Sequence, residues 1–329
     1  MSRSAAVADR LARLTGLPVR EARVVGAQHG YQHLMITLSG GRRAFAKSVP
    51  APDPSDAPAP GMVPDPSAPP DPSAALDPSA ALEPSAPPDP SAEFAAAFAA
   101  EANGLRWLAE AGAVPVPEVL AASPEALVIS MIPPGRATPE AAFGFGADLA
   151  RLHAAGADGF GAPWPGFIAS LPLDNTQDAR DWPQWYAQRR LLPFLSRAVD
   201  AGALGPEDAR LVEAVTSRIG SLAGPAEPPS RIHGDCWAGN VLWSGGRGWL
   251  IDPAAHGGHR ETDLAMLALF GAPGLDRILA GYNDTVPLAA GWRSRIPLHQ
   301  LHPLLVHACL FGASYRDEVR SAARAALAI

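Results

Sequence analysis

A proline-rich segment at residues 50–92 limits what this chain can fold into more than any other feature. It holds 15 of the 36 prolines, and from Asp53 onward it falls into six-residue units such as DPSAPP and DPSAAL. Proline interrupts the hydrogen bonds of helices and central strands, and the units lack a large β-branched residue to fill a hexapeptide β-helix. We therefore expect an extended, solvated insertion. It is either a tolerated expansion of a surface loop or a docking linker.

The net charge of the chain is concentrated in the same segment. Residues 50–92 carry 7 of the 33 acidic residues and no lysine or arginine, so 26 acidic residues face 26 basic ones in the remainder. That balance provides no net basic charge to attract nucleic acid. There is no run of 18 apolar residues and no signal-peptide pattern, and two cysteines make no disulfide framework. We expect a cytoplasmic protein, with a monomer favoured, that binds neither nucleic acid nor membrane.

The residues around the insertion predict a small β-rich lobe at 1–132. Residues 24–49 read as a β-hairpin with its turn at Ser39–Gly41. Apolar residues at helical spacing predict a helix at Phe94–Glu110. An apolar strand at Ala126–Ile132 then ends the lobe at a pair of prolines.

Residues 133–329 predict a larger, mostly helical lobe. Thr138 followed by Pro139 is typical of a helix start, because the hydroxyl caps the helix and proline suits its first position. The predicted helices span residues 138–153, 182–199, 206–222, 262–270, 275–282 and 297–311, with a bend at Pro193 and short strands within 232–251. The predicted fold class is α+β, with a cleft between the two lobes.

The sequence HGDCWAGN at 233–240, followed by a strand that ends at Asp252, carries the chemistry. Phosphoryl transfer needs a carboxylate that accepts the proton of the attacking hydroxyl, and amide and carboxylate oxygens that hold Mg²⁺ against the phosphates. Asp235 suits the first role, and Asn240 and Asp252 suit the second. The spacing resembles the H-R-D-x-x-x-x-N loop of protein kinases, with glycine in place of arginine. Taken singly, His233 reads as a core histidine and Asp252 as a turn former, but their shared order favours a catalytic loop.

The cation that a kinase places on the phosphates is expected to be Lys47, the only lysine in the chain. It lies on the return strand of the hairpin, and Glu101 of the next helix is the partner that we expect to orient it. Gly26 and Gly30 are the two glycines of a candidate phosphate-covering loop that lacks the full G-x-G-x-x-G pattern, and its backbone N–H groups are candidates for binding the phosphates. An ordinary hairpin turn accounts for these two glycines equally well.

Beyond these motifs, the chain resembles the fructosamine kinase/ketosamine-3-kinase family, which is related to the aminoglycoside and choline kinases. The family's HGDLWSGN appears as HGDCWAGN, with departures at Cys236 and Ala238. Its D-P-A…G-H-R-E-x-D-L-A-M pattern is matched almost whole by residues 252–266, and its L-F-G-x-x-Y ending by 310–315. The match covers residues 20–49 and 93–318 and leaves the insertion outside.

The resemblance implies a two-lobed protein-kinase-like fold and an ATP-dependent kinase. Its substrate would be a ketosamine, an Amadori-type adduct of a sugar and an amine, which is phosphorylated at the 3-hydroxyl. Asp235 would be the base and Mg²⁺ the cofactor, and adenine would meet the backbone of Met131 and Ile132 at an inter-lobe hinge.

The same resemblance implies that Trp237, His259 and Glu261 border the sugar site. Asp263 and His233 more often support such a catalytic loop than touch substrate, because buried carboxylates usually accept hydrogen bonds from backbone donors. Two alternatives stay open. One is an aminoglycoside-, homoserine- or choline-type kinase of the same fold. The other is a non-catalytic nucleotide-binding interaction protein that uses the proline-rich arm as a tether.

Overall fold

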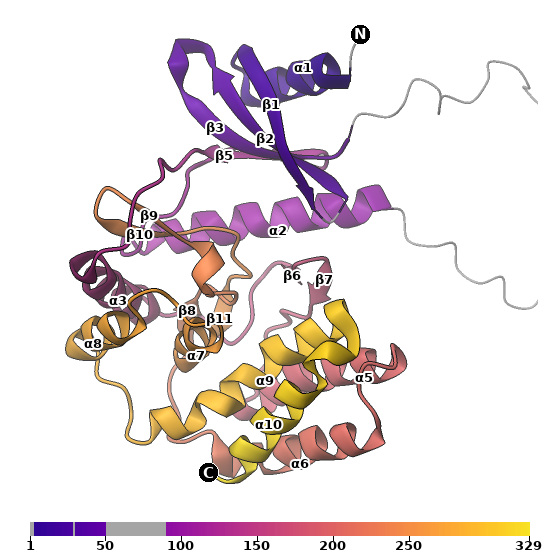
Figure 1. The fold of residues 1–329 in the computed structure, drawn as a ribbon, viewed down its shortest axis with the longest axis vertical. Coiled ribbons are helices and arrows are strands. Elements are labelled where there is room, and N and C mark those ends of the chain that lie inside the picture. Colours follow the sequence, from indigo (N-terminus) through magenta and orange to yellow (C-terminus); the bar gives the residue numbers. More distant parts are fainter. Residues whose placement is uncertain (1–2, 29, 51–89) are drawn as a thin grey trace, which may run out of the picture.

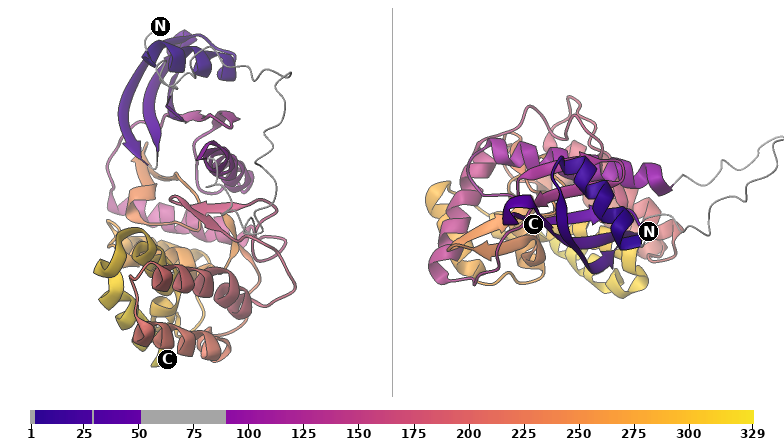
Figure 2. Two further views of the ribbon diagram at one scale, coloured as in Figure 1. Left: turned by 90° about the vertical axis from the view of Figure 1, so that its right-hand side faces the viewer. Right: turned by 90° about the horizontal axis from the view of Figure 1, so that it is seen from above.

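The computed structural model describes residues 3–28, 30–50 and 90–329, which form two stacked lobes (Figure 1). Most of the predicted insertion, residues 51–89, lies outside the described residues. The smaller lobe holds a sheet and the larger lobe is mostly helical, so the predicted α+β class is confirmed. Seen from the side, the N-terminus lies at the outer end of the small lobe and the C-terminus at the opposite end of the molecule (Figure 2).

The small lobe is built on one five-stranded antiparallel sheet. Its strands are β1 (Val19–Gln28), β2 (Tyr31–Leu38), β3 (Arg43–Ser48), β5 (Ala126–Ser130) and β4 (Val119–Ser123), in that order across the sheet. The predicted hairpin is confirmed as the β2–β3 pair, with a short 3-10 turn at Ser39–Gly41 between them. The predicted strand at 126–132 is confirmed, although it ends two residues early, at Ser130.

Alternating side chains bury both faces of this sheet. On β3, Ala44 and Ala46 face α1 (Arg3–Thr15), a helix that the sequence analysis did not predict. Phe45 and Lys47 face the other way, toward α2 (Pro90–Glu110), which begins four residues before the predicted Phe94. Successive residues of a strand point to opposite faces, so this register places the lysine on the side of the sheet that faces the larger lobe (Figure 1).

The helical lobe follows the predicted pattern closely. Its helices are α3 (Pro139–Ala154), α4 (Trp182–Tyr186), α5 (Leu192–Asp200), α6 (Pro206–Leu222), α7 (Glu261–Leu269), α8 (Leu275–Thr285), α9 (Trp292–Phe311) and α10 (Arg316–Leu327). Three strand pairs complete it: β6 (Gly166–Ile168) with β7 (Leu171–Leu173), β9 (Val241–Ser244) with β10 (Arg247–Leu250), and β8 (Ser230–Ile232) with β11 (His256–Gly258). The side chain of Thr138 accepts a hydrogen bond from the N–H of Ala141, 3.1 Å away, and so caps α3 as predicted. The sequence analysis missed α10 and the β6–β7 pair.

Two prolines shape the centre of this lobe. The helix predicted at 182–199 is interrupted by a π-turn at Ala187–Leu191, directly before Pro193, because proline cannot donate the hydrogen bond that an α-helix needs there. Pro303 lies inside α9 and leaves the carbonyl of His299 without its usual helical donor. The hydroxyl of Tyr186 donates to that carbonyl at 3.1 Å and ties α4 to α9.

Among the helices in the described ranges, none combines the length and apolar character that a membrane crossing requires.

Candidate active site

A cavity of about 670 Å³ opens between the two lobes. The small lobe and α2 contribute polar residues that include Gln28, Lys47 and Glu101. The helical lobe contributes the loop that starts at Asp235 and the residue Asp252 after β10. The two sequence motifs that suggested phosphoryl transfer therefore reach the same cavity.

Lys47 forms the ionic centre of this cavity. Its Nζ lies 2.7 Å from Oε2 of Glu101 and 3.1 Å from Oδ1 of Asp252, and the lysine is only 3% exposed. Burial alone would lower the pKa of Lys47, but the two carboxylates outweigh it and raise the pKa. The amine therefore stays positively charged.

The catalytic loop is closed by an internal hydrogen-bond pair. Nδ2 of Asn240 donates to the carbonyl oxygen of Asp235 and to its Oδ2, both at 2.9 Å. Gly234 adopts a positive φ of 81°, and a Cβ there would lie 2.3 Å from the carbonyl oxygen of Ala254. Only glycine fits this position without strain, which explains why no arginine stands there.

The Asp235 carboxyl lies at the cavity wall, close to other negative charges. Burial raises its pKa to about 7 and outweighs the opposing hydrogen bond from Asn240, and the charges of Asp252 and Asp263 act in the same direction as burial. A base whose pKa lies near the working pH can both accept and release a proton readily.

Asp263, in the first turn of α7, holds the backbone of the loop through hydrogen bonds. Its Oδ2 accepts from the N–H of His233 at 2.7 Å, and its Oδ1 accepts from the N–H of Gly234 at 2.9 Å. Nε2 of His153 lies 3.1 Å from the same carboxylate, and the ring of His233 contacts the carbonyl of Ile251 at 2.9 Å. The structure thus places Asp263 and His233 where the sequence analysis expected loop support.

Asn240 and Asp252 offer the donor set that Mg²⁺ prefers. The printed hydrogen bonds of Asn240 use its amide nitrogen, which leaves the amide oxygen as an acceptor. Asp252 has a positive φ of 52° and a partly exposed carboxylate, of which Oδ1 contacts Lys47. Both side chains line the cavity. An amide oxygen and a carboxylate oxygen at one cavity wall fit a magnesium ion.

The glycines of the predicted phosphate-covering loop lie at the β1–β2 turn. Gly26 lies in β1 beside a register irregularity, and Gly30 has a φ of 84°, with a Cβ position only 2.6 Å from Cζ of Phe94. Gln28 and Tyr31, rather than the two glycines, are the residues of this turn that line the cavity. Contact between the glycine backbone and phosphates stays a prediction.

The two residues of the predicted adenine hinge follow β5 as expected but do not line the cavity. Met131 and Ile132 follow β5, and the N–H of Met131 donates to the carbonyl of Arg43 at 3.3 Å. Among the described residues, those that line the cavity include neither of the two. Their contact with adenine therefore stays a prediction.

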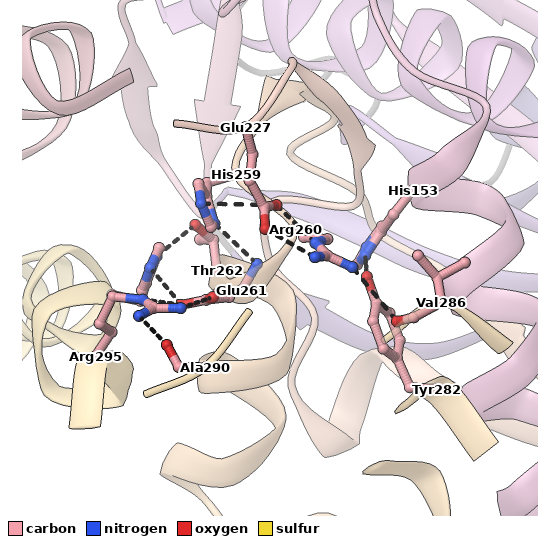
Figure 3. Close-up of polar contacts among 11 residues, drawn as sticks. His153, Glu227, His259, Arg260, Glu261, Thr262, Tyr282, Val286, Ala290 and Arg295 are labelled. Carbon is pink, nitrogen blue, oxygen red and sulfur yellow. Dashed lines mark hydrogen bonds and ion pairs between the residues drawn. The ribbon is translucent and has the colours of Figure 1, made fainter. Parts of the chain in front are cut away.

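Trp237 lines the cavity, whereas His259 and Glu261 do not. Figure 3 shows His259 and Glu261 in a network of polar contacts with residues such as Arg295. His259 and Glu261 are each 3% exposed. Glu261 accepts hydrogen bonds from Nη2 of Arg295 at 2.6 Å and from Nε of Arg295 at 2.9 Å. The ring of His259 packs 4.7 Å from that of Trp182. The expectation that both residues border the sugar site is therefore corrected: this segment turns inward, where α9 supplies the partner for its carboxylate.

The same cluster contains a group of possible metal ligands. Nitrogen and oxygen atoms of His259, Glu261 and His299 lie within 4.8 Å of one another. Burial would raise the pKa of Glu261, but hydrogen bonds from His299 and Arg295 lower it to about 2. Because the guanidinium of Arg295 already pairs with both carboxylate oxygens, a metal ion would have to displace it. The cluster is a buried ionic network that joins α7 to α9.

Sequence reasoning missed most of the aromatic residues at the cavity. Phe270, His307, Phe311 and Tyr315 line it from the helical lobe. Phe311 and Tyr315 lie within a stretch that matched the family's sequence pattern, yet nothing in their spacing indicated a surface toward the catalytic loop. Apolar periodicity along a helix predicts a buried face and does not say which residues at its end face a cavity.

Comparison with known proteins places the chain in a family. The family model described as fructosamine kinase matches residues 90–328. The chain is 35% identical over 224 residues to the probable ketoamine kinase YniA of Escherichia coli K12, which covers 66% of this chain and 76% of that protein. A solved structure from Thermobifida fusca, assigned as a fructosamine-3-kinase, is 47% identical with a TM-score of 0.83, and the match covers 98% of this chain and 99% of that one.

More distant structures share the fold alone. The ternary complex of the aminoglycoside phosphotransferase APH(2")-IIa with streptomycin and ATP has a TM-score of 0.59 at 14% identity, covering 98% of this chain and 97% of that one. The two-lobed protein-kinase-like fold is therefore shared beyond the family. From the family match and the two closely similar proteins, we conclude that this chain belongs to the fructosamine kinase family and is an ATP-dependent phosphotransferase.

Proposed function

We propose that the protein transfers the γ-phosphoryl group of ATP to the 3-hydroxyl of the sugar in a ketosamine. One observation carries this proposal: Lys47, Asp235, Asn240 and Asp252 meet at one cavity between the lobes. These four residue types are the parts that phosphoryl transfer requires. The family to which the chain belongs supports the sugar-amine substrate.

The proton leaves the substrate through Asp235. In the proposed reaction the sugar oxygen forms a bond to the γ-phosphorus, the bond between that phosphorus and the bridging oxygen of ADP breaks, and the hydroxyl proton passes to Oδ1 or Oδ2 of Asp235. Asn240 holds this carboxylate in position through two hydrogen bonds of 2.9 Å. A carboxylate with a pKa of about 7 is partly ionised at neutral pH and can act as the base.

In this proposal, Lys47 of the small lobe and a magnesium site of the helical lobe bind the nucleotide phosphates. Lys47, oriented by Glu101, offers its ammonium to the phosphate oxygens. Asn240 and Asp252 would hold Mg²⁺, which neutralises negative charge on the phosphates when bound. The shared fold with a phosphotransferase that was solved in complex with ATP supports ATP as the nucleotide.

The test is ATP consumption by the purified protein with Mg²⁺ across a panel of ketosamines, aminoglycosides, choline and homoserine. We expect turnover on ketosamines, a product phosphorylated at the 3-hydroxyl by NMR, and loss of turnover in Asp235→Asn. The matched control is Asp208→Asn, a buried carboxylate of α6 that lies outside the cavity.

Other outcomes would reject parts of the proposal. Turnover on an aminoglycoside, choline or homoserine but on no ketosamine would contradict the substrate class and support a related kinase. Stabilisation by Mg-ATP without turnover on any alcohol would support a non-catalytic nucleotide-binding protein. An Asp235→Asn variant that turns over like the parent would reject the assignment of the base.

A further inference from the structure

The cavity has two chemically different ends. The charged residues that line it are Lys47, Glu101, Asp235 and Asp252. Lys47 pairs with Glu101 and Asp252, and Asp235 accepts a hydrogen bond from Asn240. Away from this group, the lining is aromatic and aliphatic. The proposed chemistry needs only the charged end, so the apolar end is free to contact another part of the substrate.

Five rings form a continuous surface at the apolar end, which we call the aromatic wall. Its members are Trp237, Phe270, His307, Phe311 and Tyr315, all of which line the cavity. Trp237 lies 6.2 Å from Phe270, Phe270 lies 5.1 Å from His307, and His307 lies 5.6 Å from Phe311 and 4.8 Å from Tyr315, as distances between ring centres. Trp237 lies two residues after Asp235 in the chain, and both line the same cavity.

Much of this wall is exposed. Trp237 and Phe270 are each 40% exposed and Phe311 is 61% exposed, which makes them three of the large apolar side chains that the described chain leaves uncovered. A cluster of exposed rings beside a catalytic cavity is typical of a surface that binds an apolar group.

The wall has no cationic side chain that would pair with a carboxylate on the carrier. Among the described residues that line the cavity, Lys47 is the one lysine or arginine, and it already pairs with Glu101 and Asp252. The ring of His307 donates from Nδ1 to the carbonyl of Pro303 within the same helix at 2.7 Å. A carboxylate placed against these rings would lose its water without gaining a cation.

We propose that the aromatic wall binds the amine carrier of the ketosamine and selects carriers with an uncharged alkyl or aryl stem next to the glycated nitrogen. This inference rests on the proposed ketosamine kinase activity and names the substrate class of the same site. The sugar lies at Asp235, the glycated nitrogen lies beside Trp237, and the stem lies along Phe270 and Phe311.

Carrier chemistry decides which ketosamines fit. The ammonium of the glycated nitrogen is attracted by ring faces, and a chain of methylene groups gains from contact with the wall. An adduct on the ε-amine of lysine presents four methylene groups to the rings and leaves its backbone groups outside. An adduct on the α-amine of an amino acid instead brings a carboxylate to the wall, one carbon from the glycated nitrogen.

The test compares three ketosamines that share the sugar of fructosamine and differ in the amine: butylamine, glycinamide and glycine. We expect kcat/KM to fall in that order, with the glycine adduct about tenfold or more below the glycinamide adduct, because the added carboxylate is buried without a partner. In Phe311→Ala and Phe270→Ala, the preference for butylamine over glycinamide should fall about tenfold, mainly through KM. Phe143→Ala, which removes a half-buried ring of α3 outside the cavity, is the matched control and should keep the parent's preference.

The outcomes separate this inference from the proposed function. Equal kcat/KM for glycine and glycinamide adducts, or an unchanged preference in both wall variants, overturns the carrier site while ketosamine phosphorylation stands. No turnover on any of the three adducts rejects the proposed function itself. If Phe311→Ala does not fold, Phe311→Leu keeps apolar area and removes the ring face, so it should lower the preference less than tenfold and still more than the Phe143 control.

Discussion

Replacing Asp263 by asparagine should misplace the catalytic loop without removing any group that touches substrate. The carboxylate is fully buried and accepts from the backbone N–H groups of His233 and Gly234 at 2.7 and 2.9 Å. Asparagine has the same shape, but its NH₂ group replaces one acceptor. One of the two backbone donors therefore loses its partner and faces another donor.

The geometry of the buried hydrogen bonds sets the expected loss of stability and the expected loss of kcat. A buried donor left without an acceptor costs about 1–3 kcal/mol, which is a large part of a total stability of about 5–15 kcal/mol. The same loss loosens the chain one residue before Asp235. Displacement of a catalytic group by about 1 Å can lower the rate about 100-fold. We therefore expect Asp263→Asn to lower kcat by that order and the free energy of unfolding by about 1–3 kcal/mol.

The assay pairs steady-state kinetics with urea unfolding. The control is Asp208→Asn, because Asp208 is equally buried and accepts from the N–H of Gly205 and from Arg316, both at 2.7 Å. The control should lose similar stability and keep the parent's kcat. If Asp263→Asn lost stability but kept kcat within threefold of the control, the claim that this carboxylate positions the catalytic loop would be refuted.

Three further predictions follow from the same geometry. The kcat/KM of the parent should fall as pH drops through about 7, because protonation of Asp235 removes the base; a pH profile that stays flat down to pH 5 would contradict this. Glu101→Gln removes the negative charge that lies 2.7 Å from Nζ of Lys47 and should raise the KM for ATP about tenfold, which an ATP titration measures; an unchanged KM would argue against the orienting role. Tyr186→Phe deprives the carbonyl of His299 of its 3.1 Å donor. It should lower the free energy of unfolding in urea by about 1–3 kcal/mol and leave kcat unchanged. Equal stability would refute the claim that this hydroxyl replaces the donor that Pro303 lacks.

Much of the secondary structure could be predicted from the sequence, because it depends on contacts between neighbouring residues. The cap at Thr138, the helix at 206–222 and the hairpin around Ser39–Gly41 depend on neighbouring residues, and the structure has each of them where the sequence indicates. The motif residues at 233–240 and 252 are close in the chain, so their common cavity could also be anticipated. Lys47 was predictable because strand alternation alone chooses the face on which it lies.

Features that depend on contacts between distant segments could be seen only in the folded structure. The sequence could not show that His259 and Glu261 turn inward, because the partner Arg295 comes from another helix 34 residues further on. Nor could it show the raised pKa of Asp235, which follows from burial between two lobes. The aromatic wall likewise joins a loop residue, Trp237, to Phe270 directly after α7 and to His307 of α9. Burial and ring contacts are properties of packing, and packing is settled only when these elements meet in the folded chain.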